Sequence, residues 1–283
     1  MIGTIMQMQR SSFLENYIYY LDLLRGLDEL VIRGRRCKEL NNVMFDITDN
    51  NNIVFFLDKK KYIEYLTGEL FWYLTADDRV DVINHFSKFW NSISTNGKCN
   101  SAYGNLLFNT NDNIPKLYNN DSNQWWYTFE TLKQDMHSRR AFMLFQRPRF
   151  QYLENKDIPC TMYIIFFIRK NKFMSTVHMR SSDIRRGIIY DVPFFYVLHF
   201  NMYKNLLQYY NNLELVNMTF MTNSLHLYDI DYDFVVDINT EYIAIDDKFY
   251  VLYEDGRVDY KKLLYLIKYL LSQIDGNNQM TSV

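Results

Sequence analysis

Apolar residues recur at helical spacing through most of the first half of the chain. Ser12 to Glu15 has the pattern of a capping box, so a helix is expected to begin there. Tyr, Leu, Ile and Trp then recur every three or four positions in later segments. The expected helices are 12–24, 59–74, 78–93 and 125–136. Residues 111–123, which are rich in Asn and Asp, are interpreted as a surface loop.

After residue 140 the pattern changes to β-branched and aromatic runs, which predict buried strands. The expected strands are 141–146, 161–169, 173–179 and 215–222, with a helix over 192–210, a hairpin arm over 251–258 and a last helix over 260–274. No Pro/Gly/Ser-rich linker and no internal repeat divides the chain. The sequence therefore predicts one α+β domain over 1–283, with helices packed against a mixed sheet.

Composition narrows the function classes. The 283 residues are 48% hydrophobic and 17% aromatic, which is typical of a globular protein rather than a disordered one. A net charge of -2 argues against binding duplex nucleic acid through a basic surface. Three scattered cysteines favour a reduced cytoplasmic compartment and predict neither a disulfide framework nor a metal site. The apolar run 162–168 is too short to span a membrane and no secretory signal is visible, so a soluble protein is expected.

Cys160 is the first candidate for chemistry. It follows Pro159, whose fixed φ can hold the cysteine at the mouth of the strand that comes next. A cysteine attacks as its thiolate, so the thiol pKa of roughly 8.5 must be lowered by nearby cations. Arg180 and the pairs Arg139-Arg140 and Arg185-Arg186 are the available cations. The alternative is a buried apolar cysteine with no reactivity.

Glu69 has Tyr and Leu three or four positions before it and Trp and Tyr three or four positions after it. A carboxylate on such an apolar helical face loses water, and its raised pKa suits proton transfer near neutral pH. The alternative is that this part of the helix faces solvent.

Three further polar groups are candidates for binding. Arg180 to Asp183 offers a guanidinium, two hydroxyls and a carboxylate, which suits a phosphate, or it forms a polar turn. Asp191 precedes Val-Pro, where Asp commonly caps a helix. His226 and Tyr228 alternate along one strand and therefore share a face, where they either bind a sugar hydroxyl or meet water.

In chain order, these segments resemble thymidylate synthase and its relatives, the phage pyrimidine hydroxymethylases, above all the deoxycytidylate 5-hydroxymethylases. The matching segments are ELFWYL at 69–74, SAYG at 101–104, HSRR at 137–140, Pro-Cys at 159–160, RSSDIRRG at 180–187 with Tyr-Asp at 190–191, and LHLY at 225–228. The resemblance runs from about residue 11 to residue 230. It implies the thymidylate-synthase fold, with one face of the sheet at a homodimer interface.

The resemblance also implies a mechanism. Cys160 would add to C6 of a pyrimidine nucleoside monophosphate, so that C5 becomes a nucleophile toward the methylene group of 5,10-methylenetetrahydrofolate. Glu69, with Tyr103 and ordered water, would transfer protons as the C5 hydrogen leaves. Asp191 would contact the base.

The binding residues implied by the resemblance fall into two sets. The nucleotide set is Arg33, Arg139, Arg140, Arg180, Ser181, Asp183, Asp191, His226 and Tyr228, with Arg139 and Arg140 reaching the phosphate of the neighbouring subunit. The folate set is Lys59, Lys60, Trp90, Asp183 and Gly187. The lysines are equally ordinary at a helix start.

Three departures from the synthase pattern bear on substrate and product. Synthases carry Asn where this chain has Asp191, and a carboxylate suits the amino group of cytosine better than O4 of uracil. The tryptophan that shields the methylene intermediate in synthases is matched one position out of register, at Phe89 or Trp90. The terminal segment that closes over the folate in synthases has no evident counterpart. Water access then favours a hydroxymethyl product over a methyl product.

The leading hypothesis is a folate-dependent dCMP hydroxymethylase, acting in the host cytoplasm if the protein is viral. Three alternatives stay open. The substrate could be the ribonucleotide CMP, or the enzyme could be a dUMP methylase or hydroxymethylase. The third is a catalytically silent relative that binds a nucleotide or RNA.

Overall fold

The computed structural model describes residues 12–48, 50–51, 53–55, 59–109, 123–236 and 240–274. Its main sheet has seven strands in the order β1-β2-β8-β6-β5-β4, and β7 also pairs with β8. The strands are β1 (Leu30–Ile32), β2 (Arg35–Ile47), β4 (Phe142–Leu144), β5 (Thr161–Arg169), β6 (Lys172–Met179), β7 (Ser182–Asp183) and β8 (Glu214–Tyr228). β8 runs parallel to β6 and β7 while the other pairs are antiparallel, so the sheet is mixed as expected.

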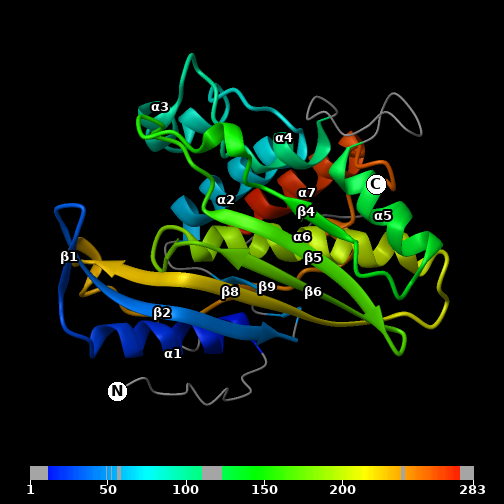
Figure 1. Cartoon of the computed structure of the whole chain (residues 1–283), viewed down its shortest axis with the longest axis horizontal. Helices are drawn as coiled ribbons and strands as arrows, with labels where there is room; N and C mark the ends of the chain where they lie inside the picture. Colours follow the sequence, from blue (N-terminus) through cyan, green and yellow to red (C-terminus); the bar gives the residue numbers. More distant parts are fainter. Residues whose placement is uncertain are drawn as a thin grey trace.

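Helices cover one face of this sheet. They are α1 (Phe13–Arg25), α2 (Lys59–Leu74), α3 (Phe89–Ile93), α4 (Tyr103–Phe108), α5 (Gln124–Gln134), α6 (Ile188–Leu207) and α7 (Tyr260–Ser272). β3 (Val54–Phe55) and β9 (Tyr242–Ile243) form a small second sheet. Figure 1 shows α1 beside β2 and β8, and α6 running along the sheet with α2, α4, α5 and α7 gathered near it. The predicted α+β architecture is confirmed.

Alternation along the strands gives the sheet two different faces. One row of paired residues crosses β2, β8, β6, β5 and β4, and every member of it is buried: Phe45, Phe220, Val177, Ile164 and Met143. The next row lies on the opposite face, and every member of it is at least partly exposed: Met44, Met221, His178, Tyr163 and Leu144. Only the first face is covered by helices among the described residues.

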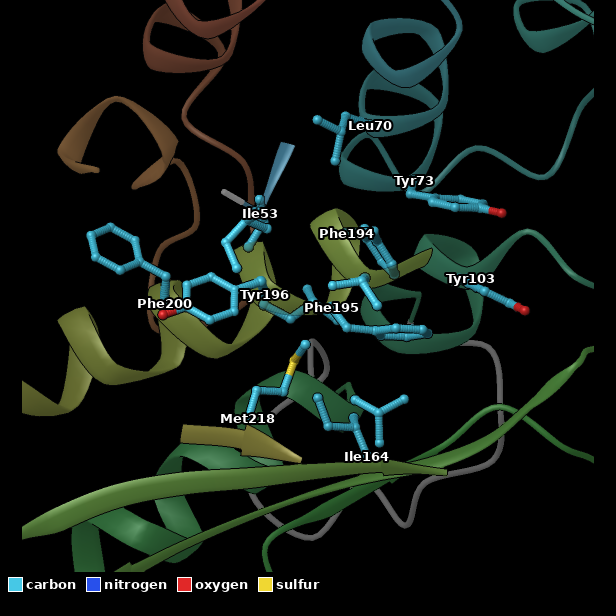
Figure 2. Close-up of a cluster of buried hydrophobic side chains, with 14 of the residues drawn as sticks. Ile53, Leu70, Tyr73, Tyr103, Ile164, Phe194, Phe195, Tyr196, Phe200 and Met218 are labelled. Carbon is cyan, nitrogen blue, oxygen red and sulfur yellow. The ribbon is translucent and has the colours of Figure 1, made fainter. Parts of the chain in front are cut away.

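The buried face meets a core rich in aromatic side chains. Phe13 of α1 stacks on Phe45 of β2, with ring centroids 6.3 Å apart. Figure 2 shows Phe194 and Phe195 of α6 between the sheet and α2. In the same view Tyr73 and Tyr103 lie at one end of the cluster, and their hydroxyls point away from the rest of it.

Several local expectations are confirmed. Ser12 Oγ accepts the backbone N–H of Glu15 at 3.2 Å, and Glu15 Oε2 accepts that of Ser12 at 3.4 Å, so the capping box is present. The helix over 59–74 and the strand over 161–169 have the expected bounds. Leu252 and Val258 form an isolated antiparallel bridge in the expected hairpin. The expected loop over 111–123 lies outside the described residues, except for Asn123.

The expected helix over 78–93 is wrong. Only a 3-10 turn at Ile83–His85 and the short α3 form there. Lys98 forms bridges with Arg79 and Thr95, which bends this segment into a compact loop. The Phe86 ring fills the space beside Gly68 of α2, where a Cβ would lie 2.4 Å from it. Contacts with distant residues therefore override the helical spacing.

Strand β2 was not expected, because its sequence mixes charged and apolar residues without a clean alternation. It pairs with β8 from Cys37 to Ile47, and β8 continues to Tyr228, beyond the expected end at residue 222. No helix of the described residues is long and apolar enough to cross a bilayer.

Candidate active site

The four side chains expected to be catalytic come from four elements. Glu69 lies in α2, Tyr103 begins α4, Cys160 directly precedes β5 and Asp191 lies in the first turn of α6. Burial is the largest cause of the raised pKa values of Asp191, Cys160 and Tyr103; Glu69 adds to the shift of Asp191, and Asp191 adds to the shifts of Cys160 and Tyr103. Asp191 therefore lies within electrostatic reach of the other three, and the fold brings the whole set together.

Arg180 fixes the loop that presents Cys160. Its Nε donates to the carbonyl oxygen of Pro159 at 3.1 Å, and its Nη2 donates to that of Ile158 at 2.8 Å. The backbone N–H of Arg180 donates to the carbonyl oxygen of Cys160 at 2.9 Å. Gln146 also donates through its side-chain amide to the Pro159 carbonyl. The cysteine itself is half-buried.

Arg180 does not lower the Cys160 pKa below its ordinary value in the single chain. Burial raises the pKa of this thiol, Arg180 lowers it, and the carboxyl groups of Asp191 and Asp157 raise it again, so the net shift is upward. Arg180 therefore acts in the expected direction without a net lowering of the thiol pKa in the single chain, and the contribution expected from Arg139 and Arg140 across a dimer interface stays a prediction. The arginine is present, but desolvation outweighs it.

Glu69 lies in the apolar position expected from its neighbours. It is 6% exposed, and burial raises the pKa of its carboxyl group to about 7. The Tyr65 hydroxyl donates to Glu69 Oε1 at 2.9 Å, and the Tyr73 hydroxyl approaches the same oxygen at 3.5 Å. Both tyrosines lie four positions away on α2, so helical spacing was a signal for these contacts.

Trp90 lies beside this carboxyl group and not on the surface. Its indole N–H donates to the Tyr65 hydroxyl oxygen at 2.9 Å, and the side chain is 8% exposed. Phe89, the other candidate for the shielding position, is 59% exposed. Tyr65 is thus a site residue that sequence reasoning named only as an apolar neighbour.

The expected cap role of Asp191 is wrong, because α6 begins earlier, at Ile188, with Gly187 at the N-cap. Asp191 lies in the first helical turn, and burial, with Glu69 and Asp183 nearby, raises the pKa of its carboxyl group well above the ordinary value. That shift favours the protonated acid. A Cβ at Gly187 would lie 3.4 Å from Asp191 Oδ2 and 3.1 Å from the Asp183 carbonyl oxygen. Gly187 therefore leaves room beside both acidic residues.

Pro193 lies inside α6 without breaking it. Proline has no N–H for the carbonyl of the residue four positions earlier, which is Ile189. The Tyr62 hydroxyl of α2 donates to that carbonyl oxygen at 2.8 Å. This replacement hydrogen bond ties the first turn of α6, with Asp191, to the helix that carries Glu69.

Asp183 organises the turn between β7 and α6. Its Oδ1 accepts the backbone N–H groups of Arg185 at 2.8 Å and Arg186 at 3.0 Å, and it pairs in register with His226 of β8. Burial raises the pKa of Asp183, while the His226 ring opposes that shift. His226 and Tyr228 share one face of β8 as expected, with ring centroids 5.0 Å apart. Ser181, directly after Arg180, is half-buried.

The arginines of the β1–β2 hairpin have different surroundings. Arg33 is exposed at the turn with φ 52°, and Arg35 lies over the Tyr228 ring, 5.5 Å from its centroid. Both lower the pKa of Tyr228, although burial raises it overall. Arg36 is bound to Asp229, with Nη2 2.9 Å from Oδ2. Arg33 and Arg35 therefore lie near the expected sugar-binding strand, and Arg36 is engaged elsewhere.

Two expected groups are not among the charges that act on Cys160 in the single chain. Arg139 and Arg140 are exposed just before β4 and are not among the groups that shift the Cys160 pKa. Lys59 is paired with Glu241 at 2.7 Å, and Lys60 is exposed at the start of α2.

Residues 229–236, which include three aspartates, pack on the arginine-rich segments. Arg186 Nε lies 3.0 Å from Asp231 Oδ2, and the Arg185 guanidinium lies 4.2 Å from the centroid of the Phe234 ring. Together with the Arg36–Asp229 pair, these contacts hold the turn before α6 against the β1–β2 hairpin.

Asp157 is a second site residue that sequence reasoning missed. Its carboxyl group is 4% exposed and accepts the backbone N–H of Ser101 at 3.1 Å and the Ser101 hydroxyl. Asp157 lies three positions before Cys160, and Ser101 lies two before Tyr103. This contact joins the cysteine loop to the start of α4. The described residues contain no group of three or more His, Cys, Asp or Glu arranged to hold a metal ion.

Comparisons with known proteins agree with this geometry. A family model described as thymidylate synthase matches residues 33–241. The chain is 26% identical over 223 residues to a deoxyuridylate hydroxymethyltransferase of Bacillus phage SP01, covering 75% of this chain and 57% of that protein. It is 32% identical over 130 residues to a deoxycytidylate 5-hydroxymethyltransferase of Enterobacteria phage T4, covering 44% and 49%. A thymidylate synthase of Fusobacterium nucleatum is 27% identical over 177 residues, covering 61% and 60%. The matches thus span about half to three fifths of the length of these curated relatives.

Proposed function

This chain belongs to the thymidylate synthase family, and we propose that it is a folate-dependent deoxycytidylate 5-hydroxymethyltransferase. The proposed reaction converts dCMP, 5,10-methylenetetrahydrofolate and water into 5-hydroxymethyl-dCMP and tetrahydrofolate. One observation carries the proposal: Asp191, whose pKa is raised, lies within electrostatic reach of the half-buried Cys160, of Tyr103 and of Glu69, a buried acid whose pKa is also raised. The names of the phage relatives support the reaction type.

The first step of the proposed mechanism is addition of Cys160 to the base. Its thiolate forms a bond to C6, the C5=C6 electrons become a C4=C5 double bond, and N3 takes a proton from Asp191. C5 is then an enamine carbon that can attack an electrophile. The fixed loop, which Arg180 holds through the Ile158 and Pro159 carbonyls, keeps the sulfur in place for this attack.

Asp191 supports a cytidylate in this proposal. A protonated acid donates one hydrogen bond to N3 of cytosine and accepts one from the N4 amino group. N3 of cytosine is a base that can keep the proton once sulfur adds, and the resulting carboxylate stays paired with the protonated ring. The raised pKa of Asp191 supports its role as the proton donor.

Glu69 is proposed to remove the C5 proton, with Tyr103 and water between them. Its pKa of about 7 suits a group that must take and release a proton near neutral pH. Folate supplies the new carbon as a methylene group at the oxidation level of formaldehyde, which bonds to C5. Removal of the C5 proton then breaks the bond between this carbon and the folate nitrogen, so that tetrahydrofolate leaves and an exocyclic methylene group remains at C5. Gly187 fits a bound folate, because its missing Cβ leaves room beside Asp191. Lys59, the other expected folate contact, is paired with Glu241.

Water, rather than hydride, is proposed to complete the reaction. Trp90 is held against α2 by its hydrogen bond to Tyr65, and the neighbouring Phe89 is largely exposed. Because Trp90 is engaged with Tyr65 and Phe89 faces outward, neither ring covers the exocyclic methylene group at C5 in this proposal, and water can reach it. Addition of water there and loss of the Cys160 sulfur give the hydroxymethyl nucleotide.

A dUMP hydroxymethylase is the second candidate. The SP01 relative, named for deoxyuridylate, is matched by 75% of this chain. A protonated Asp191 can also donate to O4 and accept from N3–H of uracil. Uracil O4 is a weaker base than cytosine N3, which favours the cytidylate.

The test uses dCMP, CMP and dUMP, each carrying tritium at C5, with methylenetetrahydrofolate. The proposal expects tritium release from dCMP, a hydroxymethyl product and no dihydrofolate. Dihydrofolate formation would instead identify a methylase, and preferential release from dUMP would identify the second candidate. Cys160→Ser should release no tritium from any nucleotide, and appreciable residual exchange would contradict the covalent step.

A further inference from the structure

The contacts around Glu69 distinguish its two carboxyl oxygens. We infer that Tyr65 is a positioning residue: its hydroxyl donates to Oε1 of Glu69, and the indole N–H of Trp90 fixes the direction of that hydrogen bond. Oε2 is then the oxygen of Glu69 that exchanges protons. This inference rests on the proposed role of Glu69 in proton transfer and identifies the atom that performs it.

The direction of the hydrogen bonds follows from donor and acceptor chemistry. The indole nitrogen of Trp90 can only donate, and it lies 2.9 Å from the Tyr65 hydroxyl oxygen. That oxygen must therefore accept, so the single hydroxyl hydrogen of Tyr65 is free to point at Glu69 Oε1, 2.9 Å away. A proton placed on Oε1 would face this hydrogen and break the chain of bonds. The carboxyl proton therefore belongs on Oε2.

Oε2 differs from Oε1 in its surroundings. The Tyr73 hydroxyl also approaches Oε1, at 3.5 Å, whereas no described residue donates to Oε2. The buried side-chain atoms that are sealed without a partner include the Thr67 hydroxyl and the Trp72 indole nitrogen, and Oε2 is not among them. Glu69 keeps 6% of its surface exposed, and Oε2 is its carboxyl oxygen that no described side chain occupies, as proton exchange requires.

Tyr65 is held firmly enough for this role. Its ring packs against Tyr190 of α6, with centroids 4.5 Å apart, and Tyr190 in turn stacks on Tyr62 at 5.2 Å. The Trp90 ring meets Trp72 edge to face at 4.9 Å. Rotating Tyr65 away from Glu69 would disturb both helices, so the hydroxyl stays directed at Oε1.

Four described titratable groups lie within electrostatic reach of Glu69: Tyr62, Tyr65 and Tyr73 of its own helix and Asp191 of α6. Burial raises the pKa of each of them, and the charge of Glu69 raises it further. Burial is the largest cause of the raised Glu69 pKa, and the hydrogen bonds from Tyr65 and Tyr73 oppose it. Loss of the Tyr65 hydroxyl should therefore raise this pKa further.

The first test titrates Glu69 without substrate. Its protonated carboxyl group gives an infrared C=O band, which is assigned by its disappearance in Glu69→Gln. In Tyr65→Phe the midpoint of this band should rise by about one pH unit. Tyr62→Phe is the matched control, because its hydroxyl donates to Ile189 and not to Glu69, and its midpoint should stay unchanged. An unchanged midpoint in Tyr65→Phe would overturn the inference.

A second variant tests the direction of the bonds. Trp90→Phe removes the donor that orients Tyr65 but keeps the Tyr65 hydroxyl, so the midpoint should rise by less than in Tyr65→Phe. No shift in Trp90→Phe would refute the orienting role of Trp90.

The last measurement separates this inference from the proposed function. The acid limb of the pH profile for tritium release from dCMP should move to higher pH in Tyr65→Phe by the same amount as the infrared midpoint, with KM for the nucleotide unchanged. A shifted infrared midpoint in a protein that releases tritium from no pyrimidine nucleotide would uphold the positioning of Glu69 and reject the proposed function. Release with an unshifted acid limb would reject the positioning and uphold the function.

Discussion

His199 lies on the buried side of α6 with no exposed surface, and its Nδ1 shares a hydrogen bond with the Ser175 hydroxyl at 2.8 Å. Burial lowers the pKa of this histidine to about 3. Glu69 and Asp191 show the opposite shift from the same cause, since burial always penalises the charged form. At the scale of single residues, desolvation is therefore the dominant electrostatic effect in this protein.

His199 should make the fold sensitive to mild acid. Its folded pKa lies below the ordinary value of 6.5, so below pH 6.5 the unfolded chain binds a proton that the folded chain does not. This contribution to stability is complete above pH 6.5 and is lost as the pH falls toward 3. Between pH 6.5 and 5 it amounts to about 2 kcal/mol. The free energy of unfolding, measured with urea at pH 6.5 and at pH 5, should fall by about 2 kcal/mol less in His199→Gln than in the unchanged protein. An equal fall in the two proteins would contradict this prediction.

Asp191 should decide between the two bases. An amide in its place cannot give a proton to N3 of cytosine, so Asp191→Asn should shift the ratio of kcat/KM for dCMP over dUMP toward dUMP by at least about tenfold. The measurement is tritium release from both nucleotides under the same conditions. If the ratio stays constant, the pairing argument for cytidylate is wrong.

At the scale of elements, the site depends on how closely α4 approaches α2. A Cβ at Gly104 would lie 1.5 Å from the Tyr73 carbonyl oxygen, and the rings of Tyr73 and Tyr103 stack with centroids 5.1 Å apart. This contact at the carboxyl end of α2 brings Tyr103 toward Glu69. The Tyr62–Ile189 hydrogen bond does the same for α6 and Asp191.

Gly104→Ala should therefore destabilise the protein and separate the two tyrosines. The backbone oxygen of Tyr73 cannot yield as a side chain would, and overpacking of this kind costs about 3 kcal/mol. Gly26→Ala is the matched control, since its Cβ would meet its nearest atom at an ordinary 3.5 Å. Thermal unfolding should show a clear loss of Tm for Gly104→Ala and almost none for Gly26→Ala. Similar Tm values for the two variants would refute the close approach.

At the scale of the whole molecule, the outer face of the sheet is the main feature left to explain. Phe142 and Leu144 of β4 and Met44 of β2 are each about two fifths exposed, on a face that no described helix covers. An apolar face of this kind is typical of an interface between chains. We propose that it is the homodimer interface and that it brings Arg139 and Arg140 to the partner's phosphate site.

Ile165 lies within this outer face, paired with Phe142 and Thr176. A charge there would be buried on association, so Ile165→Lys should give a monomer while leaving the circular dichroism spectrum unchanged. Leu264→Lys, at an exposed position of α7, is the control and should remain a dimer. Analytical ultracentrifugation distinguishes the two masses. A dimeric Ile165→Lys would place the interface elsewhere.

We also propose that residues 1–283 form one domain, because core residues from Phe13 of α1 to Leu270 of α7 belong to one continuous cluster. A single cooperative unfolding transition, followed by calorimetry, would support it, and two separated transitions would not.

The sequence by itself determined the features that depend on neighbours within about four residues. These include the capping box at Ser12, the bounds of α2 and β5, the shared face of His226 and Tyr228, and the apolar surroundings of Glu69. Side-chain period and local hydrogen bonds act over this range, so they can be recognised before the fold is known.

Tertiary structure decided what depends on residues far apart in the chain. The contact of Phe86 with Gly68 and the bridges of Lys98 replaced an expected helix, and β8 made a strand of residues 35–47. The upward shift of the Cys160 pKa and the placing of Trp90 on Tyr65 likewise come from distant segments. Burial and charge act through space, and their balance at a side chain exists only once the chain has packed around it.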